Sequence, residues 1–203
     1  SVRSLLFVTS DKCYENVEWV WGYRENDTLG GHDPYSASKA AAELVFSSYM
    51  RSFFAHRDGI GVATARAGNV IGGGDWAADR IVPDCIRALQ AGKPIVVRSP
   101  NATRPWQHVL EPLSGYLLLA ARLFESGHAY DGAWNFGPPV GDVRTVLDVA
   151  NTIVAKFGRG SVEVHDPKNK QHEAHLLQLN SDKARQLLGW STRWDYEKTL
   201  ETT

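Results

Sequence analysis

Two short segments carry the side chains that are best suited to chemistry on a small molecule. Ser10, Asp11 and Lys12 directly follow a hydrophobic stretch, and Tyr35 and Lys39 lie four residues apart further along the chain. Residues at that spacing share one face of a helix. An ammonium group beside a phenol favours the phenolate, which acts as a base near neutral pH. Hydroxyls, a carboxylate and amines in this combination indicate chemistry on a sugar.

Hydrophobic patterning predicts the elements that position these side chains. Residues 5–9 form an apolar run that is typical of a buried strand. Residues 13–32 form a long loop that is rich in tryptophan and glycine, and loops of that length usually carry function. Asp33 and Pro34 fit the N-cap and first turn of a helix, which we expect to run to about His56.

The rest of the chain alternates between strand and helix patterns. Thr145 and Asp148 resemble a capping box that begins a helix ending near Lys156. Gly189 fits the end of a helix that Asn180 or Ser181 would cap. This alternation predicts an α/β fold. Further strands are expected at residues 61–66, 94–98, 133–136, 162–165 and 176–179, and further helices at 81–90 and 111–125.

Composition excludes several classes of function. Among 203 residues, 22 are basic and 23 are acidic, so no bulk charge attracts nucleic acid or an anionic membrane. No apolar run reaches the roughly 18 residues of a membrane helix, and no signal-peptide pattern is seen. Cys13 and Cys85 lack a C-x-x-C motif, which predicts a reducing, cytoplasmic compartment. His172 and Glu173 have no second ligand at metal-binding spacing, and no metal site is expected.

The first residues predict that the chain begins inside a fold. The sequence opens without an initiator Met and reaches the apolar residues 5–8 almost at once. A buried strand of a parallel sheet needs neighbouring strands and helices on both faces. We therefore expect part of the sheet to lie outside this chain.

The two catalytic segments resemble the extended short-chain dehydrogenase/reductase family, whose nucleotide-sugar members combine a Ser or Thr at a strand end with Y-x-x-x-K on the next helix. Ser10-Asp11-Lys12 and Tyr35 to Lys39 carry this resemblance. Within that family the chain looks like the CDP-glucose 4,6-dehydratases. Four stretches carry this narrower resemblance: residues 9–14, 18–25, 68–76 and 103–108.

The resemblance implies a partial Rossmann-like, doubly wound parallel sheet with a smaller α/β substrate-binding domain. Residues 1–70 and 104–138 would form the C-terminal part of the NAD-binding domain, and residues 71–103 and 139–203 the sugar-nucleotide-binding domain. The cofactor implied is NAD, and the substrate is a nucleotide sugar, CDP-glucose. Relatives often dimerise through the helix that carries Tyr35, so a homodimer is expected.

The implied reaction makes CDP-4-keto-6-deoxyglucose. Oxidation at C4 acidifies the C5 proton, the C6 hydroxyl then leaves, and hydride returns to C6. Tyr35 would remove the C4 hydroxyl proton, aided by Lys39, which would also hold the nicotinamide ribose, while Ser10 binds the sugar oxygen. Asp11 would protonate the leaving C6 hydroxyl, which requires a raised pKa. Lys12 would act either as the C5 base or as a cation that stabilises the C5 enolate.

The resemblance also assigns residues to the nucleotide. Asn69 matches the Asn that meets the pyrophosphate-sugar region, and Arg104 matches an Arg that binds the diphosphate. A guanidinium group suits phosphate because its donors form a planar fork. Arg80 and Arg98 are further candidates for this site.

The chain differs from the family in the segment that binds the cofactor. The glycine-rich turn that holds the NAD pyrophosphate is absent, and Gly72 to Gly74 lack the G-x-G-x-x-G spacing. On its own, the chain is expected to bind NAD poorly and to be inactive. Two alternatives remain: another nucleotide-sugar dehydratase or 4-epimerase, or a truncated, non-catalytic nucleotide-sugar-binding module. Asp11 and Lys12 argue against an epimerase, which needs no acid for a leaving hydroxyl.

Overall fold

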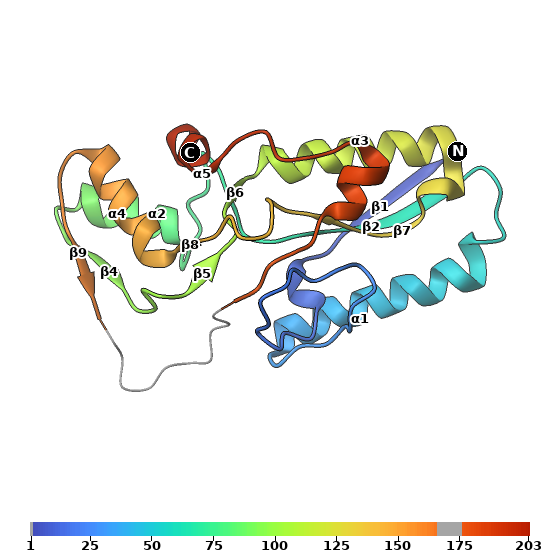
Figure 1. The fold of residues 1–203 in the computed structure, drawn as a ribbon, viewed down its shortest axis with the longest axis horizontal. Coiled ribbons are helices and arrows are strands. Elements are labelled where there is room, and N and C mark those ends of the chain that lie inside the picture. The colour runs from blue at the N-terminus through green and yellow to red at the C-terminus, as the bar shows by residue number, and fades with distance from the viewer. Residues whose placement is uncertain (1, 166–175) are drawn as a thin grey trace.

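A three-stranded parallel sheet forms the centre of the larger part of the molecule (Figure 1). The computed structural model describes residues 2–165 and 176–203. The sheet contains β1 (Ser4–Val8), β2 (Gly61–Ala67) and β7 (Gly132–Phe136), in the order β1-β2-β7. All three strands are parallel, so their carboxyl ends meet at one edge. Ser10 and its neighbours follow β1 at that edge.

Helices cover both faces of this sheet, as a parallel sheet requires. Figure 1 shows α1 (Pro34–Tyr49) along one face and α3 (Leu110–Ser126) along the other. Phe46 of α1 makes an edge-to-face ring contact with Phe7 of β1 at 5.6 Å between ring centroids. On the α3 face, the core contains Ala63, Ala65, Leu119, Leu123, Trp134 and Phe136. This arrangement is the Rossmann-like α/β fold that was expected.

A second part of the fold has its own core. α2 (Ile81–Gln90) and α4 (Val146–Phe157) pack beside the parallel pair of β4 (Ile95–Val97) and β9 (Val162–Val164). Its buried side chains include Cys85, Leu89, Val97, Val149 and Ile153.

Two pairs of short strands and a last helix connect the two cores. β3 (Val70–Ile71) pairs in parallel with β6 (Gln107–His108), and β5 (Thr103–Arg104) pairs antiparallel with β8 (Arg144–Thr145). α5 (Tyr196–Thr202) contacts β6. β3 follows β2 along the chain, and β6 precedes α3. This pair therefore lies where the chain passes between the sheet edge and the second core (Figure 1).

The long loop after β1 is packed. Cys13, Tyr14 and Tyr23 form a buried cluster with Leu177 and Leu179. Backbone bridges join Tyr14 to Leu29 and Tyr23 to Leu179. The loop therefore holds a fixed path between β1 and α1.

Two expected elements differ from the structure. The helix predicted to reach His56 is α-helical only to Tyr49 and continues as a π-helical turn over Met50–Phe54. The strand predicted at residues 176–179 is wrong, because only Leu179 makes a single bridge, to Tyr23. That segment is apolar because it packs against the aromatic loop cluster, which an isolated stretch of sequence does not reveal. The loop with His172 and Glu173 lies outside the described residues.

The capping box of α4 is confirmed. The Thr145 side chain accepts from the Asp148 backbone N–H at 3.0 Å, and the Asp148 carboxylate accepts from the Thr145 N–H at 3.0 Å. Each bond satisfies a backbone donor that the helix itself leaves unpaired.

Replacing Thr145 with Ala is expected to lower the free energy of unfolding by about 1 kcal/mol, because one of these donors loses its partner. Urea unfolding followed by circular dichroism measures the change. Asn151→Ala, at an exposed position of the same helix, is the control and should change the free energy of unfolding by less than about 0.5 kcal/mol. Equal effects of the two substitutions would show that the cap contributes nothing.

Candidate active site

The segment after β1 turns at once into a short 3-10 helix that fixes three polar side chains. Ser10 caps this turn, and its Oγ accepts from the Lys12 backbone N–H at 3.2 Å. The same hydroxyl donates to Asp11 Oδ1 at 2.9 Å. Asp11 is buried, and Lys12 is half-buried. A hydroxyl, a carboxyl and an amine are thereby held side by side at the carboxyl edge of the sheet.

Asp11 has the electrostatic environment of an acid. Burial raises its pKa above the ordinary value, and the hydrogen bond from Ser10 and the charges of Lys12 and Arg104 oppose that shift without reversing it. Gly68 leaves room for the carboxyl group, because a Cβ at this position would lie 3.2 Å from Asp11 Oδ2. The raised pKa that the acid role requires is therefore present in this fold.

Tyr35 and Lys39 lie on the first turns of α1. The Asp33 carboxylate accepts from the Ser36 backbone N–H at 3.0 Å and so caps this helix. Tyr35 is 56% exposed, and the Lys39 ammonium lies 5.6 Å from the centre of its ring. The expected pairing of phenol and ammonium on one helix face is present in the structure.

One open cavity, of about 580 Å³, gathers most of the predicted catalytic residues. It lies at the carboxyl ends of β1 and β2, beside the start of α3. Lys39 does not line this cavity, but its ammonium lies beside the ring of Tyr35, which does. The polar residues that line the cavity are Thr9, Ser10, Asp11, Lys12, Tyr35, Asn69, Asp75, Arg80 and Tyr116.

A second cavity, of about 350 Å³, adjoins the first. Asn69, Asp75 and Arg80 line both, so the two spaces share a wall. Arg98 and Arg104 line the second cavity, together with the indole of Trp106. Three guanidinium groups from separate elements suit a ligand that carries more than one phosphate. The four predicted nucleotide-binding residues are thus brought together.

Sequence reasoning missed Tyr116 and three aspartates of the cavity walls, Asp75, Asp79 and Asp84. Tyr116 belongs to an apolar run of α3, where nothing in the pattern separates it from a core residue. Burial, and secondarily the Asp11 charge, raise the pKa of Tyr116 to about 12. Tyr116 is therefore a neutral hydroxyl facing the same space as Asp11.

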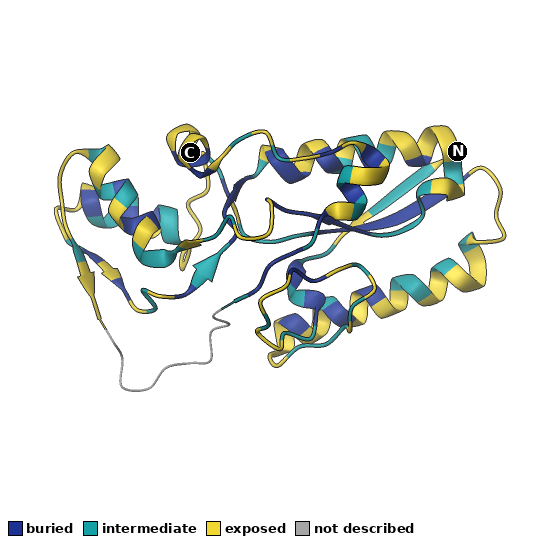
Figure 2. Cartoon of the chain, in the orientation of Figure 1, coloured by how far each residue is buried: buried dark blue, intermediate teal, exposed yellow. Residues whose placement is uncertain are grey.

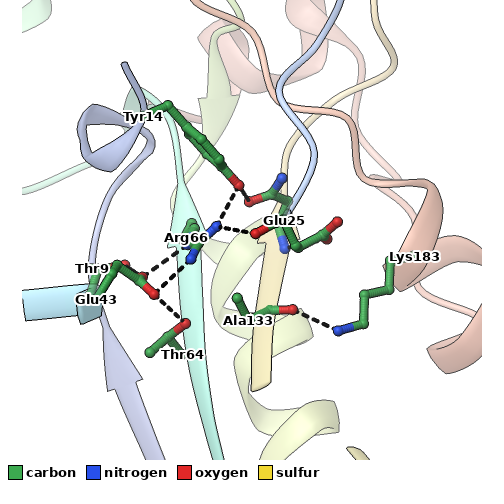
Figure 3. A network of polar contacts seen from close by, with 9 residues as sticks. Thr9, Tyr14, Glu25, Glu43, Thr64, Arg66, Ala133 and Lys183 are labelled. Carbon is green, nitrogen blue, oxygen red and sulfur yellow. Dashed lines mark hydrogen bonds and ion pairs between the residues drawn. The ribbon is translucent and has the colours of Figure 1, made fainter. Parts of the chain in front are cut away.

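A buried ion pair joins helix α1 to strand β2 (Figure 3). Glu43 of α1 and Arg66 of β2 are 2% and 3% exposed, and Arg66 Nη2 donates to Glu43 Oε2 at 2.7 Å. Burial acts to raise the pKa of Glu43, but the hydrogen bonds and charge of Arg66 hold it below its ordinary value. The pair is therefore ionised. Sequence inspection gave no signal for it, because the partners lie 23 residues apart.

Cys13 lies beside the site without being reactive. It is fully buried, and burial raises the pKa of its thiol to about 12. Cys13 is therefore a packed side chain in this structure. Within residues 2–165 and 176–203, no group of three or more His, Cys, Asp or Glu side chains is arranged to hold a metal ion. None of the helices in this described part is long and apolar enough to cross a membrane.

Comparison with known proteins places these features in a family. The profile of the GDP-mannose 4,6 dehydratase family matches residues 2–203. The chain belongs to this family. It is 48% identical to a CDP-glucose 4,6-dehydratase of Salmonella typhimurium over 98% of this chain and 57% of that protein. A dTDP-glucose 4,6-dehydratase of Streptomyces antibioticus is 26% identical over 100% of this chain and 56% of the relative.

Two solved structures share the fold of this chain. A dTDP-glucose 4,6-dehydratase of Bacillus anthracis, solved in complex with NAD, superposes with a TM-score of 0.81 at 20% identity, over 98% of this chain and 60% of the other. A UDP-glucuronic acid 4-epimerase of Bacillus cereus gives a TM-score of 0.83 at 17% identity, over 100% and 60%. Both confirm the Rossmann-like architecture expected from the sequence. The chain spans a little more than half of the length of its curated relatives.

Proposed function

We propose that this chain supplies the catalytic and sugar-nucleotide-binding portion of an NAD-dependent CDP-glucose 4,6-dehydratase, a hydro-lyase. The observation that carries the proposal is the buried carboxyl group of Asp11, which has a raised pKa and lies in one cavity with Ser10, Lys12 and Tyr35. The 48% identity to the Salmonella CDP-glucose 4,6-dehydratase supports the same reaction and the same nucleotide.

The residues of this chain are suited to bind the nicotinamide ribose of NAD but not its pyrophosphate. Tyr35 and Lys39 stand at the carboxyl edge of a parallel sheet, the edge at which open α/β folds bind their ligands. The Lys39 ammonium, close to the Tyr35 ring, is available to a ribose hydroxyl. Gly72 to Gly74 follow β3 and do not open a strand-to-helix turn that would hold a pyrophosphate. The pyrophosphate-binding turn is therefore assigned to the part of the longer relatives that this chain does not cover.

The chain's own side chains divide the proton transfers of the reaction. NAD, when bound, accepts a hydride from C4 and returns it to C6. The Tyr35 phenol oxygen takes the C4 hydroxyl proton, and Ser10 Oγ hydrogen-bonds the same sugar oxygen. Asp11 donates its proton to the C6 hydroxyl, which leaves as water, and Lys12 either takes the C5 proton or stabilises the negative charge that develops there.

The second cavity holds the nucleotide diphosphate in this proposal. Asn69, at the wall shared by both cavities, meets the junction of sugar and pyrophosphate. Arg80, Arg98 and Arg104 surround the phosphates. Arg104 also carries charge close enough to Asp11 to lower its pKa, so the phosphate site and the acid are electrostatically connected.

A 4-epimerase is the competing enzyme, since the fold is shared with epimerases. Epimerisation removes and returns hydride at C4 alone and has no leaving hydroxyl to protonate. A buried acid beside the catalytic tyrosine has a role in dehydration and none in that reaction. This difference favours the dehydratase.

The assembly follows from the same proposal. Residues 1–70 and 104–138 complete the NAD-binding domain, and residues 71–103 and 139–203 form the sugar-nucleotide domain. Figure 2 shows α1 largely exposed on the side away from the sheet. The exposed side chains of α1 include Leu44, Val45 and Tyr49, which supports a homodimer through the Tyr35 helix. The buried, unpaired cysteines support a cytoplasmic location.

Mass spectrometry of CDP-glucose and dTDP-glucose tests the function. Each sugar nucleotide is incubated with NAD and with protein that joins this chain to the dinucleotide-binding segment of its longer relatives. We expect CDP-glucose to lose one water and dTDP-glucose to react far more slowly. Folded, NAD-loaded protein that removes water from neither would refute the dehydratase and favour an epimerase or a nucleotide-sugar-binding module.

A further inference from the structure

Glu43 lies on the same side of α1 as the two catalytic residues of that helix. It follows Lys39 by four residues and Tyr35 by eight, and i, i+4 and i+8 positions lie one above another on a helix. Unlike Tyr35, Glu43 is buried, facing the sheet at only 2% exposure. The helix therefore presents Tyr35 to the cavity and Glu43 to the strands behind it.

Both oxygens of the Glu43 carboxylate are fully engaged (Figure 3). Oε1 accepts from the Thr9 hydroxyl and from Arg66 Nε at 2.9 Å. Oε2 accepts from the Thr64 hydroxyl at 2.9 Å and from Arg66 Nη2 at 2.7 Å. The two bonds to Arg66 form a planar fork, which permits one orientation of the carboxylate.

These contacts connect the two catalytic segments through one group. Thr9 immediately precedes Ser10, so its hydrogen bond ties the strand end that carries Ser10 and Asp11 to the helix that carries Tyr35. Thr64 and Arg66 belong to β2, which lies between the other strands. The carboxylate therefore fixes the distance between the base and the acid of the site.

Arg66 extends the same network to the loop that leads into α1. Its Nη1 donates to the Tyr14 hydroxyl at 2.7 Å and to the Glu25 carbonyl at 3.0 Å. The Tyr14 hydroxyl in turn donates to Asn135 Oδ1 on β7 at 2.8 Å. The loop is thus held to the sheet at two points, Tyr14 and Glu25 (Figure 3).

We propose that Glu43 and Arg66 are positioning residues, which hold the Tyr35 helix in catalytic register with the Ser10–Asp11 strand end without touching the substrate. The inference rests on the proposed function. Net stability is a weak reason for such a pair, since buried ion pairs are often replaced by apolar side chains without loss of stability. Alignment of reacting groups is a strong one, because a shift of about 1 Å costs on the order of 100-fold in rate.

The first variant is Glu43→Gln, which keeps the shape and removes the charge. The second is Glu43→Leu with Arg66→Met, which replaces the pair by apolar side chains and avoids an unpaired buried guanidinium. Both are made in the protein that joins this chain to its dinucleotide-binding segment. For each, kcat per folded molecule is expected to fall about 100-fold. The KM for CDP-glucose should stay within about threefold, because the phosphate-binding arginines are untouched.

Leu123→Ala is the matched control. Leu123 is fully buried in the core between α3 and the far end of β2, where a Cβ on Gly61 would touch it. The cavity that this substitution leaves should lower stability substantially. The folded fraction, measured by circular dichroism, corrects each rate. We expect Leu123→Ala to keep the kcat of the wild type per folded molecule.

Hydrogen exchange provides a readout that does not depend on activity. Amides of residues 9–14 and of the first turn of α1 should exchange faster in Glu43→Gln than in Leu123→Ala, because the contact between the two segments is lost. Unchanged exchange in those segments, or an unchanged kcat per folded molecule in both Glu43 variants, would overturn the positioning role. A wild-type protein that removes no water from CDP-glucose would refute the proposed function instead, and the exchange result would still decide the role of Glu43.

Discussion

Replacing Tyr35 with Phe is expected to lower kcat for water loss from CDP-glucose about 1,000-fold. In the proposed reaction the phenol oxygen is the base that takes the first proton, and removal of a general base costs typically 10²- to 10⁴-fold. The aromatic ring itself remains, so the fold of α1 and the contact with Lys39 should persist. Affinity for CDP, measured by calorimetry, should not change, because the arginines of the second cavity are unaffected.

Tyr130→Phe provides the matched control for this prediction. Tyr130 ends the short 3-10 helix Gly127–Tyr130 before β7, is half-buried and lines neither cavity. Its kcat should remain within twofold of the wild type, on the order of experimental error for a surface change. A loss smaller than tenfold in Tyr35→Phe, or equal losses in the two variants, would remove Tyr35 from its role as base.

The positions of the catalytic groups were predictable from the sequence because they depend on local geometry. Tyr35 and Lys39 share a helix, and their spacing alone places them on one face. Ser10 and Asp11 follow a strand whose apolar run is unmistakable, and the carboxyl edge of a parallel sheet is where such residues gather. Local pattern therefore predicted the element that carries each of these candidate catalytic side chains.

What fixes those groups in space was not predictable. The Glu43–Arg66 pair and the hydroxyl of Tyr116 depend on which helix covers which strand, and this is a tertiary property. The burial of Asp11 also requires tertiary structure, because the sequence shows a polar triplet that reads as exposed. The prediction of a strand at residues 176–179 was wrong for the same reason. The apolar side chains of this segment pack against the loop cluster and not in a sheet.

The convergence of the arginines illustrates the same limit. Arg80 precedes α2, Arg98 follows β4 and Arg104 lies in β5, yet all three line one cavity with Asn69. Only the resemblance to the family singled them out from the other basic residues of the chain. The structure adds that Arg104 acts on Asp11 through its charge, so bound phosphates should weaken that influence and favour the protonated acid.

Asp11→Asn is expected to lower the rate of water loss by at least 100-fold, because an amide cannot donate a proton to the leaving C6 hydroxyl. The earlier steps, loss of the C4 hydroxyl proton to Tyr35 and loss of the C5 proton beside Lys12, do not use Asp11 and should continue. In D₂O, recovered CDP-glucose should therefore gain deuterium at C5 although no water is lost. Mass spectrometry measures both events. Asp58 is exposed and lines neither cavity. Asp58→Asn is the control and should remove water at the rate of the wild type.

The pH dependence of Asp11 provides an independent check of the same assignment. Its carboxyl group must be protonated to act as the acid, so kcat of the wild type should fall as pH rises through the raised pKa. Water loss at full rate well above that pKa, or retained activity in Asp11→Asn, would exclude Asp11 as the acid.

The free energy of unfolding should also depend on pH through Asp11. The folded state holds the Asp11 proton at pH values where the unfolded chain, with an ordinary value of 3.8, has released it. Folding therefore takes up a proton, and the free energy of unfolding falls as pH rises from 3.8 through the raised pKa. Asp11→Asn removes this dependence, since an amide does not ionise. Above the raised pKa the variant should then be more stable than the wild type, and urea unfolding across the pH range measures the crossing. The Asp11 carboxyl group therefore lowers stability above its raised pKa, a cost that the proposed role as proton donor explains.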